Sequence, residues 1–355
     1  MTSRDFIEKI LSGWIKGTGP QSDVVLSSRV RIARNLVGIP FPHVASESDL
    51  GRVLDQVRRA VKESGKLKEF GILILSEIPN LDRQVLVEKH LVSPQHILEG
   101  RNRAVILSPD ETVSIMVNEE DHLRIQTLYS GFELDKSWQN ASEIDDILES
   151  RLEYAFDEKI GYLTACPTNV GTGMRSSVMV HLPALAATGQ VGRVLSTISH
   201  VGIAVRGLYG EGTESSGNIY QLSNQVTLGR SEEDIIENLR GITRQVIEQE
   251  RTARNFLLRE RQKTLEDRVW RAYGILENAR LLTSDEVLKL ISDVRLGVDT
   301  GIITVIPPRM LNELMVLTRP AYLQKLVGAE LGPEERDIQR AALVRDRVKS
   351  AREGK

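Results

Sequence analysis

Arginines, carboxylates and glycines are concentrated in three short segments of the 355-residue chain. The segments are SSRVRIARN (27–35), VNEEDHLR (117–124) and CPTNVGTGMR (166–175). Arginine binds phosphate oxygens through a planar fork of N–H donors, and a carboxylate can hold a cation or accept a proton. Together the segments suit a site that handles phosphate and a cationic substrate.

The arginines are the first candidates for an anion site. Arg29 and Arg31 are two residues apart in a strand-like run, so we expect both side chains on one face. Such neighbours repel each other unless an anion lies between them. Arg124, Arg175 and Arg206 also stand beside turns or strand ends. The five arginines could converge on a polyphosphate, although an isolated RVR is more often a pair of exposed surface arginines.

The third segment contains a glycine loop. Gly171 and Gly173 could let backbone amides approach an anion closely, although a lone GTG is most often only a turn. No Gly-Lys-Ser/Thr follows, so the loop is not a Walker A motif. Cys166 is the single cysteine, which excludes an intrachain disulfide. It lacks a catalytic partner at a suitable spacing, so we expect either a small buried side chain or a thiol tuned by nearby arginines.

Carboxylates are grouped at Glu119 and Glu120, directly before Asp121 and His122. Such a run is often the solvated start of a helix, where the helix dipole favours negative charge. Alternatively, a glutamate here could hold a cationic substrate and accept its proton. Glu211, in the glycine-rich stretch GLYGEGTESSGN (207–218), could supply a second carboxylate from a loop.

Composition narrows the classes of protein. The net charge of −3 gives no global attraction to nucleic acid or to an anionic membrane. The chain shows no signal peptide and no apolar run long enough to cross a membrane, so we expect a cytoplasmic protein. His90, His96, His122 and His181 show no zinc-like spacing, and no protein-held metal site is predicted.

The apolar patterns predict an α+β fold with a mostly antiparallel sheet, followed by helices. Strands are expected at 24–32, 72–75, 104–107 and 113–117, with several more between 160 and 228. Helices are expected at 5–15, at 46–64 with Ser46 as the cap, and at 121–155 with a break. Further helices are expected at 231–270, from Thr283, after Pro307-Pro308 and from Gly332-Pro333.

In this order and at this separation, the three segments resemble the phosphagen (guanidino) kinase family over roughly residues 24–245, and most of all its bacterial protein arginine kinases. The resemblance implies a catalytic domain with an antiparallel sheet flanked by helices, similar to that of glutamine synthetase. We therefore predict a catalytic domain over 1–255 and an all-α module over 256–355.

The resemblance also implies roles for particular residues. Glu120 and Glu211 would hold the guanidinium of the substrate, and Cys166 would lie beside it. Glu119 would lie near Mg²⁺, which the family binds mainly through nucleotide oxygens and water. The residues expected to bind ATP are Ser27, Ser28, Arg29, Arg31, His90, Arg124, Arg175 and Arg206.

Departures from the family pattern concern the substrate and the nucleotide. Because SSRVR begins at residue 27, the N-terminal domain that closes over small guanidines is not expected, which favours arginine side chains of proteins as substrates. Met179 and Thr227 stand where many relatives have a histidine and an arginine. The alternatives are a kinase of a small guanidino compound such as free arginine, and a non-catalytic adaptor that binds phosphoarginine.

Arg336, Asp337, Arg340 and Ala341 form an RDxxRA sequence early in the last helix. Arg336 and Arg340 are four residues apart, so they are neighbours on one helix face, and solvated ion pairs would account for them. The resemblance implies an allosteric phosphoarginine pocket instead. It also implies a stress-response role, a homodimer, and as partners a heat-shock repressor substrate, the activator protein McsA and the Clp protease machinery.

Overall fold

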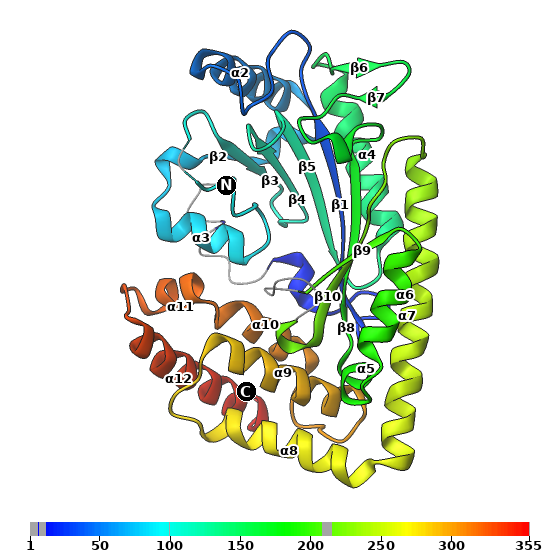
Figure 1. The fold of residues 1–355 in the computed structure, drawn as a ribbon. Coiled ribbons are helices and arrows are strands. Elements are labelled where there is room, and N and C mark those ends of the chain that lie inside the picture. The colour runs from blue at the N-terminus through cyan, green and yellow to red at the C-terminus, as the bar shows by residue number, and fades with distance from the viewer. Residues whose placement is uncertain (1–5, 7–11, 99, 208–214, 355) are drawn as a thin grey trace.

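An eight-stranded sheet organises the first part of the chain in the computed structural model, which describes residues 6, 12–98, 100–207 and 215–354 (Figure 1). Every neighbouring pair of strands is antiparallel, as predicted. The strand order across the sheet is β2 (Gly71–Ile74), β3 (Ala104–Leu107), β4 (Val113–Val117), β5 (Leu123–Ser130), β1 (Val25–Arg34), β8 (Met174–His181), β10 (Ile219–Asn224) and β9 (Ile203–Gly207).

The central strand β1 separates an apolar face from a polar one. Val30 and Ile32 are fully buried and point to the helices that cover one face of the sheet. Arg29 and Arg31 alternate with them, so the pleat of the strand places both arginines on the opposite face. This arrangement confirms the prediction from the RVR spacing.

Helices cover the apolar face, where α4 (Leu134–Glu149) packs on β1 and β5, and α7 (Glu232–Glu260) on β8 and β10 (Figure 1). The predicted cap of α2 (Glu47–Glu63) is confirmed, because Ser46 and Asp49 form a capping box. The other elements of this part are η1 (Gly13–Lys16), η2 (Leu67–Glu69), η3 (Leu75–Glu77), α3 (Asn80–Glu88), β6 (Phe156–Asp157), β7 (Gly161–Tyr162), η4 (Pro167–Asn169), α5 (Pro183–Ala187), α6 (Val191–His200) and η5 (Ser216–Asn218).

The helix predicted from residue 121 is wrong, because β5 occupies Leu123–Ser130 and the helix begins only at Leu134. Leu123, Ile125 and Thr127 are buried on one side of this strand. Gly131 then turns the chain with φ 71°, and a Cβ there would lie 2.6 Å from the backbone of Gly19. The strand-only prediction for 160–228 is likewise incomplete, since α5 and α6 separate β8 from β9. The helix predicted at 5–15 falls largely outside the described residues.

The C-terminal part is all helical, as predicted. Arg261, with φ −138°, breaks the predicted 231–270 helix into α7 and α8, and the helix predicted from Thr283 is confirmed; Ser231 caps α7 and Thr283 caps α9. The predicted boundary at residue 255 falls inside α7. The helices after α7 are α8 (Gln262–Asn278), α9 (Ser284–Asp299), α10 (Pro308–Leu317), α11 (Pro320–Val327) and α12 (Pro333–Arg352).

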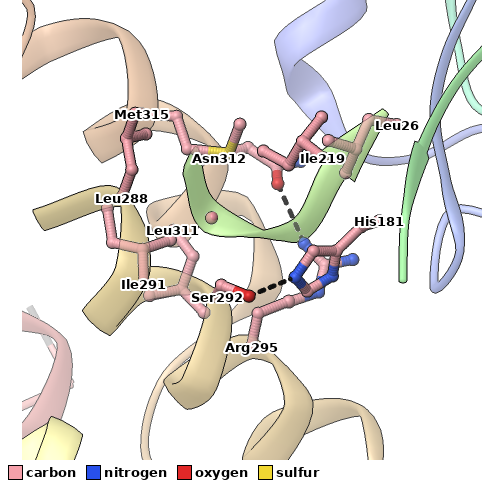
Figure 2. Close-up of a pocket in the computed structure, with 11 residues that line it drawn as sticks. Leu26, His181, Ile219, Leu288, Ile291, Ser292, Arg295, Leu311, Asn312 and Met315 are labelled. Atoms are coloured by element: carbon pink, nitrogen blue, oxygen red, sulfur yellow. Dashed lines mark hydrogen bonds between the residues drawn. The ribbon is translucent and has the colours of Figure 1, made fainter. Parts of the chain in front are cut away.

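The helical module joins the sheet through a mixed polar and apolar contact. Figure 2 shows His181 of β8 directed at Ser292 of α9, with 2.9 Å between Nε2 and Oγ. Arg295 of α9 donates to Asn312 of α10 at 2.8 Å. The small cavity that these residues help to line has a volume of about 10 Å³. Most of its other lining side chains, such as Leu288, are apolar. No helix among the described residues has the length and apolar character needed to span a membrane.

A buried ion pair fixes the end of β1. Arg34 donates to Asp145 of α4 from Nε at 3.0 Å and from Nη2 at 2.6 Å. Its Nη1 donates to the carbonyls of Ala33 and Thr172 at 3.0 and 2.9 Å. The guanidinium also lies 3.4 Å from the ring centroid of Tyr162. Arg34 therefore connects the sheet, α4 and the glycine loop.

Replacing Arg34 with methionine should lower the free energy of unfolding by about 3–5 kcal/mol, because Asp145 would remain buried without its counter-charge. Urea denaturation followed by circular dichroism would measure the change. The control is Arg52→Met, which removes an exposed ion pair with Asp49 and should change stability by at most about 0.5 kcal/mol. Equal stability of the two variants would contradict this role for Arg34.

Candidate active site

Five arginines from four strands meet at one open cleft of about 690 Å³ on the polar face of the sheet. β1 supplies Arg29 and Arg31, and three other strands supply one arginine each. Arg31 lies directly opposite Arg175 of β8 in the strand register, and Ala33 lies opposite Arg124 of β5. Arg206 comes from β9, two strands beyond β8. The fold thus brings together all five arginines that the sequence analysis selected.

The arginine cluster is strongly electropositive. Burial and the nearby Arg124 and Arg175 lower the pKa of Arg29 to about 10. The pKa of Arg31 is lowered well below its ordinary value by burial and by the same arginines. The Nε atoms of Arg31 and Arg175 are buried without a hydrogen-bond partner among the described residues. A polyanion between these groups would supply the missing acceptors and relieve the repulsion.

Arg29 and Arg175 donate hydrogen bonds to uncharged side chains within the cluster. Arg29 donates to Ser177 at 3.3 Å and to Gln221 at 2.6 Å. Arg175 donates to Ser223 at 3.2 Å. These partners orient the guanidiniums without neutralising them. The cluster therefore keeps its charge for a ligand.

Glu119 is the carboxylate that opposes this charge. Its Oε1 accepts from Arg124 at 2.7 Å and from Ser93 at 2.5 Å, and its Oε2 accepts from the amide of Glu120 at 2.9 Å. Burial raises its pKa, but Arg124 and these hydrogen bonds outweigh burial and leave the pKa lowered. Glu119 is thus held ionised at the floor of the cleft.

Glu120 lies at the rim of the same cleft and is exposed. Partial desolvation of its carboxyl group by the surrounding protein, with Asp121 and Glu119 nearby, raises its pKa, while Arg124 and a hydrogen bond with Cys166 oppose the rise. Cys166 also contacts Thr168, with 3.0 Å between Sγ and Oγ1. A carboxylate and a thiol therefore meet beside the arginines, as the sequence analysis predicted.

Asp121 holds these two groups together. One of its oxygens accepts from the side chain of Asn35 and from the amide of Ala165, each at 2.7 Å. The ring of His122 is fixed by the amide of Leu36 at 3.0 Å and by the carbonyl of Pro40 at 2.9 Å. VNEEDHLR is therefore a strand–turn–strand whose turn is locked against β1 and the cysteine loop, and the alternative of a solvated helix start is wrong.

The glycine loop packs against protein backbone. Gly171 has φ 108°, and a Cβ there would lie 2.7 Å from the carbonyl oxygen of Thr227. A Cβ on Gly173, with φ 65°, would lie 2.6 Å from the carbonyl oxygen of Ala33. The Thr227 hydroxyl donates to the carbonyls of Thr168 and Val170 at 2.9 and 2.7 Å. Close packing between loops therefore accounts for both glycines.

His90 lines the far end of the cleft beside Arg29. Its ring stands edge-on to Trp14, with 5.1 Å between centroids. Burial and the nearby Arg29 and Arg319 lower its pKa to about 3, so the ring is neutral. Met179 and Ser27 line a smaller adjoining hollow with Arg29 and His90.

Some predicted residues do not reach the cleft. Ser28 points to the opposite face of β1, where its hydroxyl donates to the carbonyl of Gly131 and accepts from the amide of Glu133. Glu211 lies outside the described residues. The sequence analysis missed Ser93 and Arg103, which also line the cleft. Ser93 stands three residues after His90, a predicted nucleotide-binding residue, and this short separation was the sequence signal that could have identified it.

The RDxxRA residues lie in the helical module, away from the lining of the cleft. Arg340 is buried and donates to the carbonyls of Thr318 and Leu282 at 2.7 and 2.8 Å, and to Asp337. Arg336 donates to the carbonyl of Leu331 at 3.1 Å. Ala341 is fully buried in the core. The expectation of a solvated helix face is therefore wrong for Arg340.

Asp121→Ala should increase the reactivity of Cys166 several-fold, because the turn and the cysteine loop would lose their shared carboxylate. Since Cys166 is the only cysteine, the rate of reaction with Ellman's reagent measures this one thiol. Asp110→Ala is the control, since the Asp110 carboxylate accepts hydrogen bonds from Ser108 and Thr112 in the β3–β4 turn, away from Cys166. An unchanged thiol rate in Asp121→Ala would show that the loop holds its position without this link.

Two family models match the chain. The model described as ATP:guanido phosphotransferase, C-terminal catalytic domain, matches residues 52–253. The model described as Protein-arginine kinase McsB C-terminal domain matches residues 262–355. Among solved structures, lombricine kinase has a TM-score of 0.58 and 23% identity, covering 69% of this chain and 70% of that one. A taurocyamine kinase from Schistosoma mansoni with transition-state analogue components has a TM-score of 0.59 and 24% identity, covering 72% and 38%.

Much more similar proteins occur in bacteria. A protein-arginine kinase of Halothermothrix orenii is 53% identical, over 98% of this chain and 99% of the relative. Protein-arginine kinases of Symbiobacterium thermophilum and Bacillus licheniformis are 54% and 49% identical, over 97% and 100% of this chain and 98% of each relative. With both parts of the chain matched and relatives similar over almost their whole length, the chain belongs to the ATP:guanido phosphotransferase family, in its group of bacterial protein-arginine kinases.

Proposed function

We propose that this protein transfers the γ-phosphoryl group of ATP to arginine side chains of other proteins. The observation that carries the proposal is the cleft itself, which is lined by five arginines and by Glu120, with Cys166 hydrogen-bonded to that glutamate. Near full-length similarity to protein-arginine kinases favours a protein substrate over a small guanidine. The retained Glu119 and Glu120 favour catalysis over a purely adaptor role.

The arginine cluster would bind the phosphates of the nucleotide and offset the charge that spreads over the transferring group. His90 and the hollow beside Met179 would accept the base. Among the described residues, no cluster of three or more histidine, cysteine or acidic side chains could hold a metal by itself. Mg²⁺, which neutralises phosphate charge when bound, would therefore be held mainly by nucleotide oxygens and water, with Glu119 nearby.

Residues at the rim of the cleft would position and deprotonate the nucleophile, which is an arginine nitrogen of the substrate. An arginine side chain is protonated at neutral pH because its pKa is far above 7, so its nitrogen must lose a proton as the N–P bond forms and the bond between the γ-phosphorus and ADP breaks. Glu120 would orient that nitrogen and accept its proton. Its raised pKa makes it a better base than an ordinary glutamate. We expect Glu211 to supply a second contact to the guanidinium.

The biological setting follows from the same family membership. We propose a cytoplasmic, homodimeric enzyme of the stress response that marks proteins for the Clp protease machinery. A heat-shock repressor would be one substrate, and the protein McsA an activator.

We also propose that phosphoarginine binds the helical module through Arg336, Asp337 and Arg340 and acts there as an allosteric ligand. Arg340 would have to exchange its present carbonyl partners for the phosphate.

Incubation with γ-labelled ATP should label an arginine-rich basic protein more efficiently than an equal concentration of free arginine. The product is a phosphoramidate, so the label should be lost in acid and retained in alkali. Preferential labelling of free arginine would support the small-guanidine alternative. If neither acceptor supported ATP turnover, the result would favour the alternative of a non-catalytic adaptor.

Glu120→Gln should reduce the turnover number by about 10²–10⁴-fold, because the transferred proton would lose its acceptor. The affinity for ATP, measured by calorimetry, should stay within about twofold, since the arginines that contact phosphate are unchanged. The matched control is Glu158→Gln on the exposed β6–β7 turn, which should behave like the parent. Near-normal turnover in Glu120→Gln would remove Glu120 from the mechanism.

Arg336→Ala should weaken binding of a phosphoarginine peptide to the module by at least about tenfold, since a charge-assisted contact to phosphate contributes about 1.5–3 kcal/mol. Calorimetry would measure the peptide, and ATP affinity would serve as the internal control. Arg347→Ala, which removes another half-buried arginine of the same helix, is the matched variant. A peptide that binds Arg336→Ala as tightly as the parent would place the pocket elsewhere.

A further inference from the structure

The first turn of α11 is capped by a carboxylate from a distant part of the chain. Glu88, the last residue of α3, accepts hydrogen bonds from the amides of Ala321 at 2.9 Å and of Tyr322 at 2.7 Å. Amides in the first turn of a helix have no partner within the helix, and the helix dipole favours a negative charge there. Both oxygens of Glu88 are thus engaged by the helical module.

His90, two residues after Glu88, lines the cleft. Lys89 is the C-cap of α3, and the backbone of His90 adopts φ 59°, a left-handed conformation that is unfavourable for a residue with a Cβ. Gln126 donates to the carbonyl of His90 at 2.9 Å, and Trp14 donates to that of Lys89 at 3.0 Å. The position of the His90 ring therefore depends on how the end of α3 is held.

The RDxxRA helix, α12, contacts the segment that leads into α11. Thr318 follows α10, and its carbonyl accepts from Nε of the buried Arg340 at 2.7 Å. Two residues later α11 begins, and its first turn meets Glu88. A continuous series of contacts thus runs from α12 through Thr318 and the start of α11 to Glu88 and His90.

Charged residues of the helical module also affect the pKa values of Glu88 and His90. Burial raises the pKa of Glu88, while the two α11 amides, Arg319 and Arg340 oppose the rise. Arg319 also contributes to the lowered pKa of His90. The two cations of the module are thus close enough to act on Glu88, and one of them acts on His90 as well.

We propose that Glu88 is a positioning residue for the nucleotide, which holds the end of α3 and the His90 ring in place by binding the N-terminus of α11. The affinity for ATP consequently depends on how the helical module is seated. The inference rests on the proposed function, because it takes the cleft as the ATP site. It adds a residue that contacts neither ATP nor the reacting atoms.

The test compares Glu88→Gln with two controls. Glu88→Gln keeps one amide acceptor but loses the charge and the second acceptor. Glu77→Gln removes an exposed carboxylate just before α3. Lys325→Met breaks an ion pair between α11 and α3, Lys325 with Asp82 at 2.7 Å, and leaves Glu88 intact. Circular dichroism would confirm that each variant is folded, and Glu88→Asp, which keeps the charge on a shorter side chain, would replace Glu88→Gln if that variant did not fold.

Glu88→Gln should raise the dissociation constant and the KM for ATP by about tenfold, within the usual range of coupling between sites, and leave kcat at saturating ATP within about twofold. Both controls should match the parent. ATP binding by Glu88→Gln as tight as the parent's would overturn the proposal. An equal loss in Lys325→Met would also overturn it, because general docking of α11 would then explain the effect.

A readout without nucleotide separates this inference from the proposed function. Amide hydrogen exchange over residues 86–92 should be faster in Glu88→Gln than in the parent and in Glu77→Gln, whether or not ATP binds. Unchanged exchange there would overturn the positioning role even in an active kinase. Faster exchange in a protein that fails to bind ATP would instead count against the proposed function.

Discussion

Mutual repulsion among the arginines on the polar face of the sheet is the constraint on which the active site depends. Arg31 stands opposite Arg175 in the β1–β8 register, and like charges directly opposite on a sheet are unfavourable. Val30 and Ile32 hold β1 in this register through full burial on the other face. The packing of the apolar face therefore maintains an unfavourable charge arrangement, which a bound polyphosphate would convert into a favourable one.

A second set of contacts places the acid–base groups next to that charge. Asp121 joins the β4–β5 turn to the cysteine loop, and Thr227 holds the same loop from the side of β10. Neither residue lines the arginine cleft, yet together they set the distance between Glu120 and Cys166. A fixed distance matters because proton transfer and alignment of a nucleophile both require contact within hydrogen-bond reach.

Local sequence signals predicted part of this arrangement and failed where tertiary contacts decide the outcome. The alternation of Arg29 and Arg31 with buried residues, the cap at Ser46 and the helix start at Thr283 depend on neighbours in the sequence, and these predictions were correct. The acidic run before His122 looked like a helix start because propensity does not register the distant partner of Asp121, the side chain of Asn35. Ser28 was misplaced because its partners, Gly131 and Glu133, lie more than a hundred residues away.

Arg340 illustrates the same limit and also shows how the two parts of the chain depend on each other. Spacing alone indicated an exposed ion pair, whereas the side chain is buried and bonded to the segments that precede α9 and α11. These two helices contact opposite flanks of the catalytic part. α9 meets η5, where Asn218 donates to Ser292 at 2.9 Å, and α11 meets the end of α3. Because η5 leads into β10 and the end of α3 leads to His90, a single buried guanidinium in the module supports both sides of the cleft. A change in the contacts of Arg340 would therefore act on two elements that bracket the site, whereas a change in an exposed ion pair of α12 would act on neither.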